Sequence, residues 1–352
     1  MLYQWINKSL NIDGGRAIAL EGLLVALLVF IMSVITLSIV IPILKKHKVG
    51  QPIHNVLENH AVKAGTPTMG GVGFIIALLI ILLVWVVLEV CGVLGEIDKS
   101  GLVVFAYTLL LGVGNALIGI VDDRAKLRRK QNEGLTSKQK MFLQIVIASA
   151  YVAVMAISGN LQTGFVIPFT SLSLNLSYAA YPLYVLIIVG FVNSTNITDG
   201  LDGLASSVGV TVAATLLLLS CFIGQRYMGV ISGALIGALC GFLVFNHYPA
   251  RVFMGDTGSL FIGGIIVGCA VSSGHLIAVM IMGLVFVLDM LSSMLQTLYY
   301  KRTKKRLFLR APVHHHFELL EWKETKIVAL FSIVSLVFCL IGFMGVVLPV
   351  IL

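Results

Sequence analysis

Apolar runs long enough to cross a lipid bilayer recur along the whole chain, and they restrict the fold more than any other feature. A membrane-spanning helix needs about 20 consecutive, mostly apolar residues. Charged residues make up only 11% of the chain, far below the roughly 25% of a soluble domain. We therefore predict an all-α polytopic membrane protein with one integral membrane domain over residues 1–352. Its ten spanning helices are expected at approximately 21–44, 69–90, 101–121, 140–158, 179–194, 203–224, 229–246, 257–273, 275–300 and 326–349.

The basic residues indicate which connections face the cytoplasm. Twenty of the 24 Lys and Arg residues lie in four alternate connections, at 45–68, 122–140, 246–256 and 301–326. Basic residues concentrate in cytoplasmic loops, so these connections are expected on that side. With ten spans both termini are then extracytoplasmic, and residues 1–20 are expected to form a short interfacial segment. The net charge of +8 suits anionic lipid or an anionic substrate and requires no nucleic acid.

The connection at 159–178 is expected on the extracytoplasmic side. Its second half alternates polar and apolar residues, which predicts a small two-stranded β-ribbon. The five cysteines have no paired spacing and are interpreted as small core residues.

A polar stretch at 193–204 separates two of the apolar runs. It reads Asn-Ser-Thr-Asn-Ile-Thr-Asp-Gly-Leu-Asp-Gly-Leu, and amide and carboxylate groups at this density are too costly to face hydrocarbon. Gly200 and Gly203 would let the backbone turn with positive φ near a ligand. Asp199 and Asp202 would share one face of a helix that began here. Taken alone, the stretch also fits an ordinary turn with a helix cap.

Two further acidic segments fall at the cytoplasmic edge. Asp122 and Asp123 end the third apolar run, where the partial negative charge of a helix C-terminus disfavours acids. A cation must compensate, either Arg124 and Lys126 or a bound divalent metal. Asp256 lies among glycines just before a helix, where the alternative is a simple N-cap. Together with the stretch at 193–204, these carboxylates predict a Mg²⁺ site of hard oxygen ligands.

Basic and hydroxyl groups that could bind a polyphosphate accompany the carboxylates. The segment 63–71 has the features of an anion cradle, with Lys63, the Thr68 hydroxyl, glycines and a following helix N-terminus. A Gly/Pro turn that caps this helix is the alternative. Lys126 and Lys138 are candidate phosphate ligands.

The predicted helix at 275–300 and the loop after it carry further polar residues. Asp289 and Gln296 are seven residues apart and so lie on one helical face. Asp289 is a functional candidate because it is ionisable within a span, or else a hydrogen-bonded packing residue. Three histidines follow at 314–316, for which phosphate binding is favoured over a shared metal.

Five segments together resemble the cytoplasmic signatures of the polyprenyl-phosphate hexosamine-1-phosphate transferases. The run Ala-Pro-Val-His-His-His-Phe-Glu is most similar to the phospho-N-acetylmuramoyl-pentapeptide transferase family within that group. The resemblance extends over essentially the whole chain, including the number of helices. The segments are Lys63–Gly71, Val121–Arg124, Asn193–Ala205, Phe253–Leu260 and Ala311–Glu318.

The resemblance implies a reaction and its partners. It implies Mg²⁺-dependent transfer of phospho-MurNAc-pentapeptide from UDP-MurNAc-pentapeptide to undecaprenyl phosphate, giving lipid I and UMP, by a homodimer in the bacterial plasma membrane. Transfer of GlcNAc-1-phosphate to the same lipid is the alternative. A secondary transporter is disfavoured because the carboxylates cluster at one edge rather than at the midplane between repeated halves.

The residues and the resemblance together assign the site. The connections at 45–68, 122–139, 195–202, 246–256 and 301–325 would form it. The catalytic residues would be Asp122, Asp123, Asp256, His315 and His316, with Asp256 as the metal ligand. The substrate-binding residues would be Lys63, Thr68, Lys126, Lys138, Asn193, Asn196, Asp199, Asp202, Gly255, Gln296 and His314.

Two mechanisms are compatible with these residues. A phosphate monoester has a second pKa near 6, so the lipid phosphate is largely dianionic at neutral pH and needs no strong base. In one mechanism Asp122 positions this phosphate, or removes its residual proton, for direct attack. In the other, Asp122 or Asp123 forms an aspartyl-phosphate first.

Overall fold

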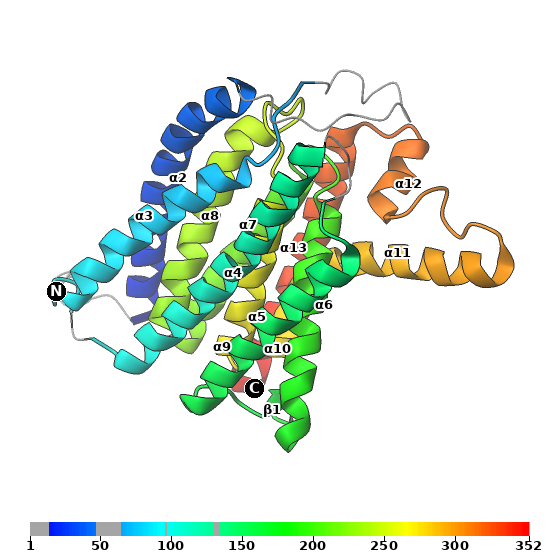
Figure 1. The fold of residues 1–352 in the computed structure, drawn as a ribbon. Helices are drawn as coiled ribbons and strands as arrows, with labels where there is room; N and C mark the ends of the chain where they lie inside the picture. The colour runs from blue at the N-terminus through cyan, green and yellow to red at the C-terminus, as the bar shows by residue number, and fades with distance from the viewer. Residues whose placement is uncertain (1–13, 47–64, 96, 130–133, 352) are drawn as a thin grey trace.

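The computed structural model describes residues 14–46, 65–95, 97–129 and 134–351, and most of them belong to helices that run side by side in one bundle (Figure 1). In chain order the helices are α2 (Gly14–Lys46), α3 (Gly71–Val90), α4 (Lys99–Arg129), α5 (Ser137–Ile157), η2 (Ser177–Ala179), α6 (Ala180–Thr198), α7 (Leu204–Ile223), α8 (Arg226–Asn246), α9 (Gly255–Ser272), α10 (Leu276–Met282), α11 (Leu284–Thr303), α12 (Val313–Leu319) and α13 (Glu324–Ile351). Among the described residues the strands are β1 (Gly164–Val166) and β2 (Ser173–Asn175).

The number of spanning helices agrees with the prediction. Within the described residues, nine helices are long and apolar enough to cross a membrane, and the bent pair α10–α11 raises the number to ten. The prediction of an all-α polytopic membrane protein is confirmed. Residues 1–13 of the predicted interfacial segment lie outside the described residues, and from Gly14 onward the chain already belongs to α2.

Helix α9 forms the centre of the bundle. All its residues over 257–271 are buried, and small residues let the neighbouring helices come close. A Cβ on Gly264 would lie 2.9 Å from the Cα of Gly112 on α4. Gly233 of α8 likewise packs against the backbone of Gly22 on α2. Such close approach favours helix association in membranes, where hydrophobic burial between helices contributes little.

The predicted span at 275–300 is not one continuous helix. α10 and α11 are two helices that meet at an angle of 75°, with Gly283 between them. A Cβ at this position would lie 2.6 Å from the ring of Phe191 on α6, so a glycine is needed at the packed corner. Glycine is also a poor helix former. Helix α11 therefore runs across the direction of the other long helices, and α12 lies beside it (Figure 1).

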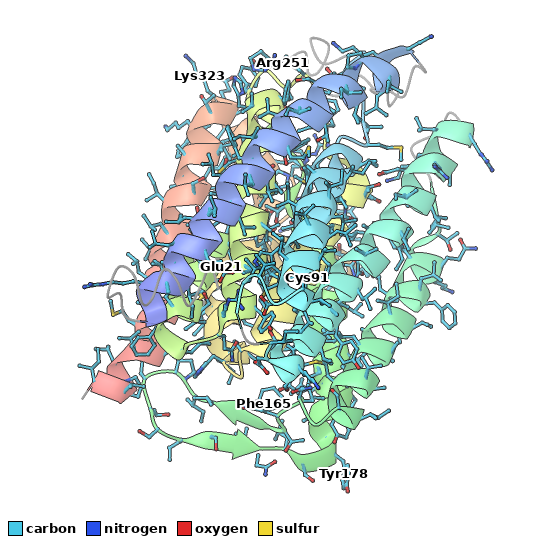
Figure 2. All side chains as sticks on the ribbon, turned by 90° about the vertical axis from the view of Figure 1, so that its left-hand side faces the viewer. Glu21, Cys91, Phe165, Tyr178, Arg251 and Lys323 are labelled. Carbon is cyan, nitrogen blue, oxygen red and sulfur yellow. The ribbon has the colours of Figure 1, made fainter. Side chains whose placement is uncertain are left out.

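The bundle has two chemically different ends. At one end, here called the ribbon end, β1 and β2 pair antiparallel, which confirms the predicted ribbon. Phe169 N donates to Gly345 O of α13 at 2.8 Å, so the C-terminal part of α13 also lies at this end. Figure 2 shows Arg251 and Lys323 at the opposite end from Phe165. This opposite end, here called the basic end, contains the connections α4–α5, α8–α9 and α11–α13.

Candidate active site

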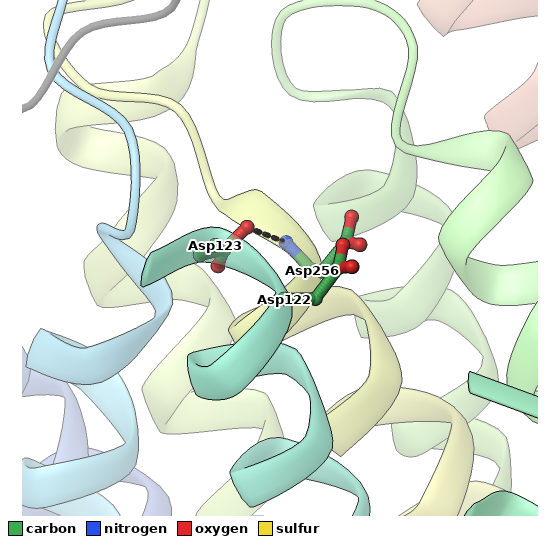
Figure 3. Close-up of side chains that lie close together, drawn as sticks. All are labelled: Asp122, Asp123 and Asp256. Carbon is green, nitrogen blue, oxygen red and sulfur yellow. Dashed lines mark hydrogen bonds between the residues drawn. The ribbon is translucent and has the colours of Figure 1, made fainter. Parts of the chain in front are cut away.

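Three aspartates meet at the basic end, where the end of α4 faces the first turn of α9 (Figure 3). Carboxylate oxygens of Asp122, Asp123 and Asp256 lie within 4.8 Å of one another. The two helices are close because Gly119 lacks a side chain; a Cβ there would lie 2.5 Å from the backbone of Asp256. Residues far apart in the sequence thus form one cluster, which we call the acidic centre.

Asp123 holds the beginning of α9 in place. Its carboxylate accepts hydrogen bonds from the backbone N–H of Asp256 (3.1 Å) and Thr257 (3.0 Å), and from the Thr257 hydroxyl (2.8 Å). Figure 3 shows the first of these bonds. The first N–H groups of a helix lack partners within it and carry partial positive charge, so a buried carboxylate is stabilised there. Asp123 therefore fixes the position of Asp256.

Two lysines and an amide bind Asp256. Lys126 and Lys140 donate to its Oδ2 at 2.9 and 2.8 Å. Asn196 donates to its Oδ1 at 2.9 Å. The Lys126 ammonium also lies 2.7 Å from Oδ2 of Asp122. Three carboxylates beside two ammonium groups leave a formal excess of one negative charge, and a buried excess charge is costly unless it is compensated.

The acidic centre suits a hard divalent cation. Its three members offer only carboxylate oxygens, which Mg²⁺ and Ca²⁺ prefer over softer metals. Oxygens on opposite sides of Mg²⁺ lie about 4.2 Å apart, given bonds of about 2.1 Å. One oxygen from each of the three carboxylates lies within 4.8 Å of the other two, a spacing of the same order as this distance. A bound cation would also offset the excess negative charge, so the three aspartates could hold a divalent metal.

Lys140 is a site residue that the sequence analysis missed. The predicted ligand Lys138 is exposed on α5, whereas Lys140 reaches both Asp256 and, at 2.9 Å, the Oδ1 of Asn196. One helical turn further along α5, Gln144 is buried. Residues four positions apart lie on one helical face, so Lys140 shares the inward face of Gln144, but the burial of Gln144 is seen only in the structure and the sequence alone does not select Lys140 over Lys138.

The two predicted asparagines of α6 have different surroundings. Asn196 bonds to Asp256 and, at 2.8 Å, to the hydroxyl of Ser259 on α9. Asn193 lies one turn earlier, and its Nδ2 donates to Oε1 of Gln144 at 2.7 Å. Asn196 therefore belongs to the acidic centre, while Asn193 joins α6 to α5 beneath it.

The polar stretch at 193–204 does not start a helix at Asp199. Helix α6 continues to Thr198 and α7 begins at Leu204, so both aspartates lie in the turn between them. Asp202 accepts a hydrogen bond from Ala250 N at 2.9 Å. The pKa of Asp199 is raised well above its usual value by burial and by the negative charges of Asp256, Asp123 and Asp202. Asp199 therefore borders the acidic centre.

The two glycines of this turn act differently from one another. Gly203 has a φ of +78°, as predicted. Gly200 does not have the predicted positive φ; instead, the His314 ring occupies the space where its side chain would be. The turn therefore packs directly against the histidine run of α12.

The segment before α3 packs against the residues that lead into α9. Gly70 N and Gly71 N donate to Phe253 O and Met254 O, both at 2.9 Å. A Cβ on Gly255, whose φ is +76°, would lie 2.7 Å from Asp123 and 3.2 Å from the Thr68 hydroxyl. Thr68 and Gly255 are thus next to the acidic centre. The predicted ligand Lys63 lies outside the described residues.

Three polar side chains on one face of α11 hydrogen-bond to α12 and to the segment that precedes it. Gln296 accepts hydrogen bonds from Leu307 N (2.9 Å) and Phe308 N (3.0 Å). Ser292 accepts one from Val313 N at 2.9 Å. Asp289 is fully buried, and its Oδ2 lies 2.7 Å from Nδ1 of His314. Gln296, predicted to bind substrate, and Asp289, for which no role was assigned, thus position the histidine run.

The three histidines differ in their surroundings. His314 is buried against Gly200. His315 is hydrogen-bonded to Glu318, and burial lowers its pKa despite that partner. His316 Nδ1 accepts a hydrogen bond from Leu309 N at 3.2 Å. The contact between His314 and Gly200 joins the histidine run to the connection between α6 and α7, where Asp199 borders the acidic centre.

The fold and the site define a class. A helical membrane bundle that presents clustered carboxylates and lysines at one end is suited to charge-neutralised transfer of phosphoryl groups. Comparison with known proteins agrees. The sequence profile described as glycosyl transferase family 4 matches residues 105–274, and the phospho-N-acetylmuramoyl-pentapeptide-transferase signature 1 matches residues 63–75.

Individual relatives define the family more narrowly. A phospho-N-acetylmuramoyl-pentapeptide-transferase of Clostridium acetobutylicum is 40% identical over 321 residues, which are 91% of this chain and 97% of the relative. The protein of the same name from Staphylococcus carnosus is 39% identical over 322 residues, 90% of this chain and 97% of the relative. The chain belongs to the phospho-N-acetylmuramoyl-pentapeptide transferase family.

Proposed function

We propose that this protein transfers phospho-MurNAc-pentapeptide from UDP-MurNAc-pentapeptide to undecaprenyl phosphate, giving lipid I and UMP. The observation that carries the proposal is the contact of Asp122, Asp123 and Asp256 with Lys126 and Lys140 at one end of the bundle. Family membership supplies the substrates. The donor is a cytoplasmic nucleotide sugar, so the basic end would face the cytoplasm of a bacterial plasma membrane. We further propose that the enzyme is a homodimer, as in the family.

The transfer exchanges one bond to phosphorus for another. An oxygen of the lipid phosphate bonds to the phosphorus attached to the sugar, and the bond from this phosphorus to the bridging oxygen breaks as UMP leaves. Mg²⁺, held by Asp256 with its neighbouring aspartates, would neutralise charge on the diphosphate. Lys126 and Lys140, whose ammonium groups border the same carboxylate, would bind the remaining diphosphate oxygens.

The surroundings of the aspartates favour direct attack over an aspartyl-phosphate. Asp123 is 1% exposed and accepts three hydrogen bonds from α9, so its oxygens are poorly placed as nucleophiles. Asp122 accepts a bond from Leu135 N at 2.6 Å and pairs with Lys126. We assign Asp122 to positioning the acceptor phosphate beside Lys126, and His315 and His316 to binding the donor.

The test is UMP release by the purified protein in detergent with undecaprenyl phosphate. We expect release with UDP-MurNAc-pentapeptide and none above background with UDP-GlcNAc. Chelation should abolish the activity and Mg²⁺ should restore it, while Asp256→Asn should lower kcat by about 100-fold or more, as for loss of a key electrostatic group. Faster release with UDP-GlcNAc would favour the alternative donor. Exchange of UMP into the donor without lipid would favour a covalent intermediate.

A further inference from the structure

Two carboxylate–histidine pairs lie side by side at the start of α12. Asp289 of α11 pairs with His314, and Glu318 of α12 itself pairs with His315. The centroids of the two imidazole rings are 4.3 Å apart. Both pairs are near the acidic centre, because His314 packs against Gly200 in the α6–α7 connection that borders it.

The two pairs differ in their exposure. The side chains of His314 and Asp289 are 1% and 0% exposed, so neither is open to a ligand. The His315 side chain is 17% exposed, and that of its partner Glu318 is 8% exposed. Of these two histidines, His315 is therefore the one that a ligand can reach.

The bond between Glu318 and His315 joins no separate parts of the fold. Arg226 of α8, by comparison, pairs with Glu21 of α2 and Glu89 of α3 at 2.7 and 2.8 Å, and so holds three helices together. Glu318 and His315 are three residues apart on one short helix, where such residues are neighbours. The effect of this pair therefore falls on the imidazole ring itself.

The bond to Glu318 determines which nitrogen of His315 can meet a ligand. Oε2 of Glu318 is bonded to Nδ1 of the ring, which leaves Nε2 to face outward. A neutral ring with its proton on Nδ1 presents only a lone pair at Nε2, and a lone pair repels an anionic oxygen. The protonated ring presents an N–H there instead. His315 can thus bind phosphate through Nε2 only as an imidazolium.

Most of the surroundings of His315 oppose that charge. Burial is the largest effect, and the neighbouring His314 and Arg310 add to it, so the pKa of His315 lies below its usual value. Glu318 acts in the opposite direction, because a hydrogen-bonded carboxylate stabilises the imidazolium. Without Glu318, the protonated ring would be rarer still at neutral pH.

We propose that Glu318 is a positioning residue for donor binding: it orients His315 and stabilises the imidazolium whose Nε2 donates a hydrogen bond to the donor diphosphate. This inference rests on the transfer reaction proposed above, in which His315 binds the donor. Hydrogen bonds between charged partners are about twice as strong as neutral ones, so donor affinity should follow the protonation of His315. Glu318 thereby sets the pH range in which the donor is bound tightly.

The first test follows the charge of His315 and needs no substrate. Diethyl pyrocarbonate modifies neutral imidazole but not imidazolium, and tandem mass spectrometry locates the modified ring. The rate at His315 is measured against pH in the full-length protein in detergent. We expect Glu318→Gln to lower the midpoint of this profile by about one pH unit or more, as for loss of an opposite charge within about 4–6 Å. An unchanged midpoint overturns the proposal.

Glu321→Gln is the matched control for this test. It makes the same charge change three positions further along, at an exposed residue. We expect it to leave the midpoint of His315 unchanged. An equal fall in both variants would trace the effect to net charge rather than to the bond with Glu318, and would also overturn the proposal.

The second test measures the Kd of UDP-MurNAc-pentapeptide without lipid, so that titration of the acceptor phosphate does not contribute. We expect the Kd to rise with pH as His315 loses its proton, and to rise from a lower pH in Glu318→Gln. The two profiles should differ most between the two midpoints, by about tenfold for one pH unit, and converge at both extremes. A Kd raised equally at every pH would reveal a merely structural role and overturn the proposal.

His315→Gln provides a second variant for the binding test. Its Kd should be weak at low pH as well and should lack the dependence on pH; a dependence that persists would overturn the proposal. Failure of the original protein to bind the donor at any pH would contradict the transfer reaction instead. The modification profiles would then still decide whether Glu318 controls the charge of His315.

Discussion

Two lysines near the start of α5 differ sharply in their surroundings. Lys140 donates to Asp256 and Asn196, whereas Lys138 is exposed. We expect Lys140→Ala to lower kcat for UMP release by about 100-fold, the usual effect of removing one group that stabilises transition-state charge. Lys138→Ala should stay within about twofold of the original rate. Steady-state assays of both variants check this. Equal losses in the two would mean that α5 is rotated from its position here.

Gly200 provides a second test at single-residue scale. A methyl group at this position would collide with the His314 ring, so Gly200→Ala should displace the histidine run. We expect a loss of about 1–3 kcal/mol in unfolding free energy, typical of overpacking, together with a lower kcat. The matched control is Gly190→Ala on α6, where a Cβ would meet nothing within 4 Å. That variant should be neutral or slightly stabilised, and thermal unfolding of the two compares them.

The site residues could be predicted to different extents. Asp122, Asp123 and Asp256 are recognisable because carboxylates are rare in so apolar a chain and ionised groups avoid hydrocarbon. Lys140 is not recognisable from the sequence. Lys138 and Lys140 both precede the apolar part of α5, and only the rotation of that helix decides which of them faces the acidic centre. The contact between Asp289 and His314 could not be predicted either, because His314 lies on α12, which packs back against α11 after an intervening loop.

At the scale of helices, the lengths and positions of the spans follow from apolar periodicity and the thickness of a bilayer. The bend at Gly283 does not follow from the apolar pattern. Glycine is common in membrane helices, and this bend depends on contact with Phe191 of another helix. The interhelical ion pairs at the ribbon end are likewise absent from any local pattern. They join α2, α3 and α8 through three residues far apart in sequence.

The ion pairs of Arg226 give a prediction about helix association. Arg226→Met would leave Glu21 and Glu89 as buried carboxylates, 1% and 0% exposed, without their cation. Removing one partner of a buried ion pair costs about 3–5 kcal/mol, so Tm should fall markedly. Arg251→Met, at an exposed arginine, should cost less than about 1 kcal/mol. Thermal unfolding in detergent compares the two.

A combined variant separates lost charge from lost packing. Replacing Arg226 with Met and both Glu21 and Glu89 with Gln removes the uncompensated charges while keeping side chains of similar size. Removing one partner of a buried ion pair is costly because it leaves an uncompensated charge, so we expect the combined variant, which has no such charge, to be more stable than Arg226→Met. A combined variant that is as unstable as Arg226→Met alone would show that packing, rather than charge, accounts for the loss.

For the whole molecule, the decisive property is the difference between its two ends. The acidic centre and most of the basic residues lie at one end, and the ribbon lies at the other. A cytoplasmic nucleotide-sugar donor can react only if the basic end faces inward. The distribution of Lys and Arg predicts that orientation, so topology and function can be tested by the same measurement.

Single cysteines report this orientation in intact cells. Ser173→Cys lies on β2 at the ribbon end, and Thr303→Cys lies at the end of α11; both positions are exposed. The background is Cys91→Ser, because Cys91 is exposed and would itself react. We expect a membrane-impermeant maleimide to label Ser173→Cys in intact cells and Thr303→Cys only after permeabilisation. The reverse pattern would place the acidic centre outside the cell, beyond reach of the donor, and would contradict the proposed reaction.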